Sequence, residues 1–273
     1  PCEMCIRDRY ERMKITDNEY IAYCFLDAGI AYKNSGDRKK ALEYALKALD
    51  IYKKLELGDK KPIAQFLLGV SHVYSANGDV EKELEYALKA LDMYERLESS
   101  GDPSLDIAEC LMYVGAAYNS SGHQANALKY NLKALEIFER LQIGDNKNVA
   151  TCLVNVDIAY SNMGDHEKEL DYGLRALSMF DRLELGDDKH VARCLLCVAT
   201  AYSANGDHAK EIEYKLRALQ MYERMGHNDD KVCKCLMYVS GAYSNRGDHK
   251  NALEYGLRAL VLLTTTLATL KKC

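Results

Sequence analysis

The sequence predicts an all-α protein, an α-solenoid of stacked helix-turn-helix repeats. A stretch of eighteen residues recurs along the chain, its apolar residues have helical spacing, and a Gly-Asp pair divides five of the six copies. The copy YSANGDHAKEIEYKLRAL at 202–219 is similar to YSANGDVEKELEYALKAL from Tyr74 and to YSNMGDHEKELDYGLRAL from Tyr160. Repeats of this kind stack because each one can bury its apolar face only against its neighbours.

A glycine in each turn sets the period of the repeat. It falls at Gly36, Gly78, Gly122, Gly164, Gly206 and Gly247, which are 42, 44, 42, 42 and 41 residues apart. A constant spacing of this length predicts one pair of helices per repeat.

The fifth repeat shows how each helix is predicted. Cys194, Val198 and Ala201 are spaced by four and three, which indicates one face of a first helix. Gly206 can adopt the left-handed conformation that ends this helix, and Asp207 can cap the next one. The second helix is indicated by the same helical spacing at Ile212, Leu216 and Leu219.

Three segments follow from this alignment. We expect a repeat array at 10–264 and a C-terminal tail at 265–273. The array begins with a partial repeat at 10–20, because YERM at 10–13 matches YERM at 222–225 in a second helix. Six repeats follow, at 21–62, 63–106, 107–148, 149–190, 191–231 and 232–264. Residues 1–9 are expected to be a leader of non-native origin, because MCIRDR resembles a translated sequencing adapter.

Three columns of the alignment are nearly invariant from repeat to repeat. They are Tyr32, Tyr74, Tyr118, Tyr160, Tyr202 and Tyr243 in the first helices, and Tyr44, Tyr86, Tyr130, Tyr172, Tyr214 and Tyr255 with Ala48, Ala90, Ala134, Ala176, Ala218 and Ala259 in the second. Catalysis would need one special residue rather than six copies. We therefore interpret these columns as packing positions.

These features together resemble the tetratricopeptide repeat family. The resemblance rests on the motifs GIAY or GAAY, then Gly-Asp, then ALEY and a late Ala-Leu. The period is similar to that of the long-period subclass found in kinesin light chains. The resemblance implies a right-handed superhelix whose first helices line a concave groove that binds peptides or partner proteins. In three repeats Glu83, Glu169 and Glu211 replace an alanine expected early in the second helix, so local packing there is expected to differ.

Composition excludes some classes of function. The chain has 273 residues and a formal net charge of −5, which argues against a nucleic-acid ligand. Its longest apolar run, ALVLLTTTLATL, is shorter than the roughly 20 residues that span a bilayer. No phosphate-binding loop or catalytic constellation is evident, so we predict a protein that is not an enzyme and has no cofactor.

The cysteines are predicted to be core residues rather than ligands. Cys24, Cys110, Cys152, Cys194 and Cys235 occupy one column of the first helices. Successive copies should lie too far apart for disulfides, so we expect free thiols and a cytoplasmic location. His190, Cys194 and Cys197 share a helical face that could hold a metal, but a fourth ligand is missing and core packing is favoured.

Positions that vary between repeats are the candidate ligand contacts. A binding groove should differ from repeat to repeat, because each repeat meets a different part of the ligand. Such columns, adjacent to the core stripe of the first helices, give the groove residues Tyr23, Asp27, Gln65, His72, Glu109, Tyr113, Asn155, Arg193, Thr200, Lys234 and Tyr238. The alternative is a solvated surface that binds nothing.

The function predicted from these features is a protein-interaction scaffold that binds a peptide or partner protein. The alternative is a regulatory or sensor domain of a larger enzyme or signalling protein. An RNA-binding helical repeat would need a more basic groove and is disfavoured. Leu260, Leu262 and Leu263 near the C-terminus are expected to allow end-to-end self-association.

Overall fold

The computed structural model describes residues 19–55, 60–98, 104–226 and 229–270. The leader at 1–9 and most of the partial repeat at 10–20 therefore lie outside the described residues. The chain divides into two compact units, residues 1–121 and 122–273, each of which is described by itself.

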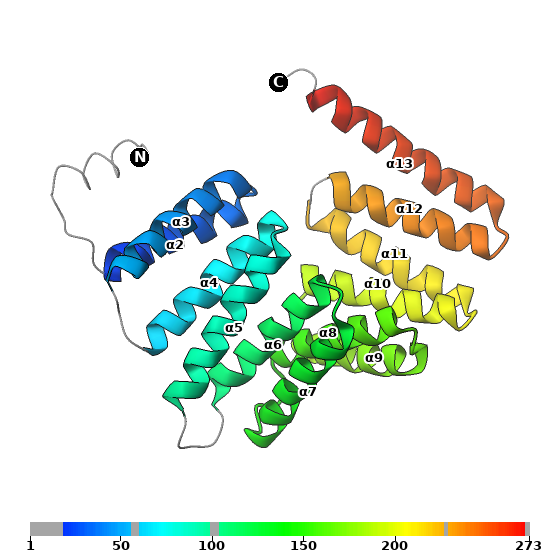
Figure 1. Ribbon diagram of the computed structural model, residues 1–273. Helices are drawn as coiled ribbons and strands as arrows, with labels where there is room; N and C mark the ends of the chain where they lie inside the picture. Colours follow the sequence, from blue (N-terminus) through cyan, green and yellow to red (C-terminus); the bar gives the residue numbers. More distant parts are fainter. Residues whose placement is uncertain (1–18, 56–59, 99–103, 227–228, 271–273) are drawn as a thin grey trace. The chain divides into compact units, whose positions relative to one another are not determined.

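The described residues form helices and no strands, which confirms the predicted fold class (Figure 1). The first compact unit contains α2 (Glu19–Asn34), α3 (Arg38–Lys54), α4 (Lys61–Asn77), α5 (Val80–Leu97) and α6 (Leu105–Ser120). The second contains α7 (Gln124–Arg140), α8 (Lys147–Met163), α9 (His166–Arg182), α10 (Lys189–Ala204), α11 (His208–Arg224), α12 (Asp229–Asn245) and α13 (His249–Leu270).

Helices pack in sequence order within each unit. In the first unit α2 pairs with α3 and α4 with α5, and α4 also contacts α2. In the second unit the pairs α8–α9, α10–α11 and α12–α13 are joined by contacts of α9 with α10 and of α11 with α12. First helices therefore alternate with second helices, as stacking repeats require.

The Gly-Asp turn has the predicted geometry. Gly206 has φ 76°, in the left-handed region, and its N–H donates to the carbonyl of Ser203. The Asp207 carboxylate then accepts the backbone N–H of Lys210 at 3.1 Å and caps α11. A left-handed position strongly favours glycine, which explains the fixed residue in every turn.

The two tyrosine columns meet across the hairpins that lie within one compact unit. Tyr74 and Tyr86 stack with ring centroids 5.5 Å apart and an interplanar angle of 5°. Lys82 lies over the outer face of Tyr74, and Lys89 lies over Tyr86, at 5.2 and 5.0 Å from the ring centroids. The same cation–ring–ring–cation arrangement recurs around Tyr32, Tyr160 and Tyr202. Aromatic pairing thus ties the first helix to the second helix in these hairpins.

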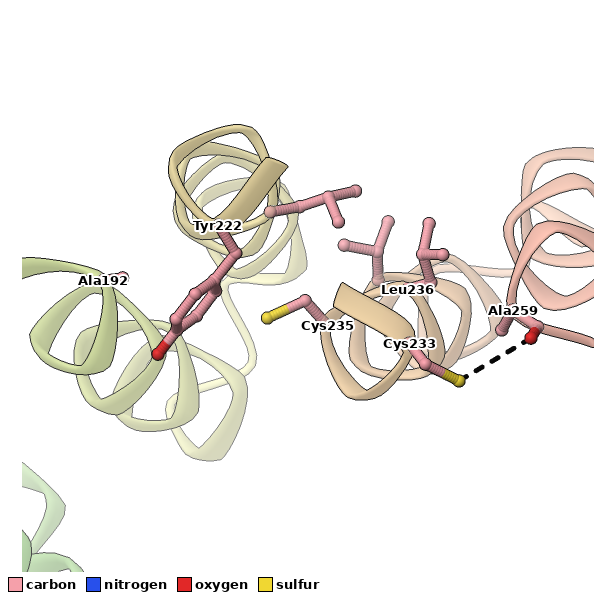
Figure 2. Close-up of a cluster of buried hydrophobic side chains, with 8 residues drawn as sticks. Ala192, Tyr222, Cys233, Cys235, Leu236 and Ala259 are labelled. Atoms are coloured by element: carbon pink, nitrogen blue, oxygen red, sulfur yellow. Dashed lines mark hydrogen bonds between the residues drawn. The ribbon is translucent and has the colours of Figure 1, made fainter. Parts of the chain in front are cut away.

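Cysteines on both sides of α12 form part of a buried cluster (Figure 2). Cys235 points toward Tyr222 of α11, whose ring is directed at Ala192 of α10. Cys233 points the other way, and its thiol donates to the carbonyl of Ala259 on α13 at 3.6 Å. These cysteines act as small apolar residues in the contacts between neighbouring helices.

The predicted cysteine column is buried in four repeats and exposed in the first. Cys110, Cys152, Cys194 and Cys235 are buried free thiols, whereas Cys24 is free but exposed, so its prediction as a core residue was wrong. The physical reason lies in what covers this column. Cys152 and Cys194 donate to the carbonyls of Asn131 and Gly173 in the preceding second helix. For Cys24 the preceding second helix would fall in residues 1–18, outside the described part.

In the second unit, bidentate Arg–Asp ion pairs connect successive loops and second helices. Arg182 donates through Nε and an Nη to both carboxylate oxygens of Asp145, at 2.6 and 2.7 Å. Arg224 binds Asp187 in the same way one repeat later. Within the described ranges, no helix is both long and apolar enough to cross a membrane.

Candidate interaction face on the first helices

The predicted groove residues lie on the first helix of each repeat. We call their outward side the first-helix face: α2, α4 and α6 carry it in the first compact unit, and α8, α10 and α12 carry it in the second. Burial places the predicted residues in three groups. Asp27, Gln65, Arg193, Thr200, Lys234 and Tyr238 are exposed, Tyr23, His72, Glu109 and Tyr113 are half-buried, and Asn155 is buried.

Two of the predicted residues in the first unit contact each other. The rings of His72 on α4 and Tyr113 on α6 meet edge to face, with centroids 4.5 Å apart. Nε2 of His72 is enclosed and has no hydrogen-bond partner. Burial, followed by the charge of Lys33, lowers the pKa of His72 to about 4, so the ring is neutral at physiological pH.

Tyr23 belongs to an aromatic cluster that the column analysis only partly identified. Its ring meets Phe66 edge to face at 5.9 Å, and Phe66 stacks on Tyr52 at 5.5 Å. The Tyr23 hydroxyl is enclosed and unpartnered, and burial followed by the charge of Glu19 raises its pKa to about 12. Phe66 occupies the cysteine column in the second repeat, so a large ring replaces a thiol there.

The first-helix face of the second unit exposes cations beside apolar surface. Arg193 and Thr200 are exposed on α10, and Lys234 is exposed on α12. Next to Lys234, Met237 is 56% exposed and Tyr238 is 49% exposed. A few residues further along α12, a Cβ at Gly241 would meet no atom within 4 Å, so the backbone itself is open there.

Asn155 does not lie on the exposed face. It is 4% exposed, and its side-chain amide donates to Oδ1 of Asn131 on α7 at 3.5 Å. Asn131 in turn donates to the carbonyl of Ala127 at 2.8 Å. Asn155 shares its column with Tyr113 and Tyr238, but an asparagine opposite it in α7 turns this position into an internal polar contact, so its prediction as an exposed contact was wrong.

A cavity of the second unit is lined by residues other than the predicted ones. This cavity, of about 740 Å³, is bounded by α7, the loop after it, α8 and α9, with Leu135, Phe138, Leu153 and Leu174 in its walls. Arg182 and Asp145 close one side of it. Among the described residues, no group of three or more His, Cys, Asp and Glu side chains could hold a metal ion.

Buried acids are the polar feature that the column analysis missed. Asp157 and Glu169 are both 0% exposed, and Glu211 is buried in the next repeat. His166 Nδ1 lies 2.7 Å from Oε2 of Glu169, and His208 makes the same contact with Glu211. The glutamates that replace the expected alanine were the available signal for this network. Nothing in one isolated repeat indicated that Asp157 would be buried.

Comparisons with known proteins agree with this architecture. Residues 21–56 match the family model described as tetratricopeptide repeat. No curated protein matches the chain.

Solved structures with the same fold cover most of the chain. BtubC (BKLC) from P. vanneervenii is 17% identical, with a TM-score of 0.66 over 88% of this chain and 92% of its own. A putative kinesin light chain from Podosopora anserina with nearly identical TPR-like repeats is 13% identical, with a TM-score of 0.61 over 76% and 98%. A Rap protein in complex with competence and sporulation factor is 15% identical, with a TM-score of 0.55 over 89% and 77%.

Proposed function

Because this chain is a protein of the tetratricopeptide-repeat type, we propose that it is a non-catalytic interaction scaffold that binds a peptide or partner protein. The proposed contact surface is the first-helix face. Its support in the fold comparisons is the Rap protein, which was solved together with competence and sporulation factor.

The observation that carries the proposal is the contrast between conserved packing columns and the variable, exposed residues beside them. On α10 and α12 the packing columns are filled by buried Cys194, Cys235 and Val239. The neighbouring column changes from Arg193 to Lys234 and stays exposed. Packing explains the first set but gives no reason for the second, and variable exposed residues are suited to reading a ligand.

Charge favours an acidic ligand on the second unit. Arg193 and Lys234 are exposed cations, and Tyr238 and Met237 add apolar surface beside Lys234. A peptide that carries Asp or Glu next to an aromatic or aliphatic side chain would complement both features. Desolvated arginine and aromatic contacts are also the residue types that most often dominate binding energy.

The test is binding of synthetic twelve-residue peptides, measured by fluorescence polarisation, with acidic, neutral and basic sets of matched apolar content. We expect the acidic set to bind, and Arg193→Glu/Lys234→Glu to weaken binding by about tenfold or more. The matched control is Arg246→Glu/Lys250→Glu, which makes the same charge change at exposed positions of the α12–α13 turn. Equal loss in both double variants would reduce the effect to net charge and contradict the proposal.

The alternative function, a regulatory or sensor domain of a larger enzyme or signalling protein, makes a different prediction. In that case the isolated chain would bind the active module of its own protein rather than free peptides. Failure of all three peptide sets, with tight binding of that module, would favour the alternative. A cytoplasmic location and end-to-end self-association stay predictions.

A further inference from the structure

Asp157 is a buried acid at a position where other repeats place small or hydroxyl residues. The equivalent residues are Gly29, Ser71, Gly115, Ala199 and Ser240. Asp157 is 0% exposed, and neither of its carboxyl oxygens has a hydrogen-bond partner. A buried ionised carboxylate without partners is strongly unfavourable, so its protonation state needs an explanation.

The two serine repeats show what this position does. Ser71 on α4 donates its hydroxyl to the backbone carbonyl of Glu83, twelve residues later on α5, at 2.8 Å. Ser240 on α12 donates to the carbonyl of Ala252 on α13 at 2.7 Å. In both repeats a side-chain O–H ties the first helix to its hairpin partner. The corresponding carbonyl in the fourth repeat is that of Glu169.

Gly173 leaves room for the Asp157 carboxyl beside the turn of α9 that follows this carbonyl. A Cβ built on Gly173 would lie 3.2 Å from Oδ1 of Asp157 and 2.7 Å from Val198, so the carboxyl occupies space that a side chain would otherwise fill. Residue 173 lies one helical turn after residue 169 in α9, so the Glu169 carbonyl points along the helix toward it. An ionised aspartate has no donor for that carbonyl, whereas a carboxylic acid has one.

In the fifth repeat a cation compensates the charge of the buried acid. There Glu211 is buried, and Lys215 donates to it at 2.6 Å while His208 contacts its other oxygen. Gly173 stands where Lys215 stands, and Asp157 stands where Ala199 stands. The fourth repeat therefore has a second acid in place of the cation.

We propose that Asp157 is a neutral carboxylic acid whose O–H donates to the backbone carbonyl of Glu169. The stability of the α8–α9 hairpin then depends on this proton. Losing this proton would leave two carboxylates facing each other in the interior. The hairpin therefore weakens as the pH rises toward the value at which Asp157 ionises. This inference is independent of the proposed peptide binding.

The groups around Asp157 act in the same direction, except for two groups on α10. Burial, followed by the negative charge of Glu169 on α9, raises the pKa of Asp157 to about 8. From α10, Cys194 and Cys197 are thiols whose own pKa values are raised by burial, so they stay uncharged near neutral pH. The S–H of Cys197 and the cation of Arg193, both on α10, are the groups that favour ionised Asp157. From α7, Asn131 faces the neighbouring Asn155 and brings no charge.

The pH window follows from the proton held only in the folded state. An unfolded aspartate ionises near pH 4, whereas folded Asp157 keeps its proton to about pH 8. Folding therefore takes up a proton between these values, and stability falls as the pH rises through them. Above about pH 8 both states are ionised, and this contribution to the slope disappears.

The first experiment follows the Asp157 carboxyl carbon by NMR in the whole chain labelled at aspartate, with Asp157→Asn to assign the signal. We expect a midpoint well above the ordinary aspartate range. A midpoint near pH 4 would overturn the proposal, and this readout needs no variant other than the one used for assignment.

The second experiment compares urea unfolding of the wild type and Asp157→Ser at pH 5.5 and 7.5. Serine reproduces the donor of Ser71 and Ser240 without a titrating group. The ratio of the unfolding constants of wild type and variant should rise about 100-fold over these two pH units. Asp171→Ser, at an exposed position of α9, should keep the wild-type pH dependence. An unchanged ratio for Asp157→Ser would also overturn the proposal.

Discussion

At the scale of single residues, the main departures from the repeat are titratable groups taken out of water. His72 is enclosed beside Tyr113, and Asp157 is enclosed beside Glu169. Burial favours the uncharged form of each, so the pKa of the histidine falls and that of the acid rises. The two residues therefore affect the stability of their respective units in opposite pH directions.

His72 gives a prediction for acidic pH. Its folded pKa, about 4, lies below its ordinary value of 6.5, so the unfolded chain binds a proton first as the pH falls. Stability from this group is complete above about pH 6.5 and is lost as the pH falls toward 4. We expect wild type to lose roughly 2–3 kcal/mol between pH 7 and 4.5 that His72→Phe retains. Urea unfolding of wild type and His72→Phe at pH 7 and at pH 4.5 measures this loss of stability.

The control for this prediction is His249→Phe, which removes an exposed histidine at the start of α13. It should keep the pH dependence of the wild type. If His72→Phe and His249→Phe had equal slopes between pH 7 and 4.5, the buried, neutral state of His72 would be wrong.

At the scale of helices and turns, the Gly-Asp pair determines where a first helix stops and its partner starts. Gly206 reverses the chain in the left-handed region, and Asp207 caps α11 within one residue. This turn therefore supplies both the acceptor and the conformation that the two helix ends need.

Placing a β-branched residue in this turn should be costly. Gly206→Val forces a branched side chain to φ 76°, and we expect a loss of about 1–2 kcal/mol or more. Asn205→Val puts the same side chain one residue earlier, where φ is −82°, and should cost less. Thermal or urea unfolding of both variants measures how much stability each one loses. Equal midpoints would contradict the assigned turn geometry.

The helices could be predicted from the sequence because the same turn and packing residues recur from repeat to repeat. The turn glycine and the two tyrosine columns recur in all six repeats, and the capping aspartate recurs in five, because His123 replaces it in the third. The candidate site was predicted less well. Asn155 was placed on the face because its column holds Tyr113 and Tyr238, yet Asn131 opposite it draws the side chain inward. The burial of Asp157 likewise depends on Gly173 in another helix. Such pairwise exchanges cannot be seen in a single column.

At the scale of the whole molecule, the chain repeats a packing solution and varies the surface beside it. In both compact units the tyrosine–cation stacks join a first helix to its second helix, and the first helices also carry the variable residues. A scaffold needs packing positions that are separate from its ligand contacts, because the packing columns can then stay constant while the ligand contacts change.

The most direct test of the scaffold function is to locate a bound acidic peptide by photocrosslinking. A benzophenone side chain at Tyr238 samples the first-helix face of α12, and the same group at Leu253 samples an exposed site on α13. We expect a crosslink from position 238 that excess unlabelled peptide removes and that Arg193→Glu/Lys234→Glu abolishes. A competed crosslink from position 253 with none from 238 would contradict it, because the ligand would then occupy the second helices.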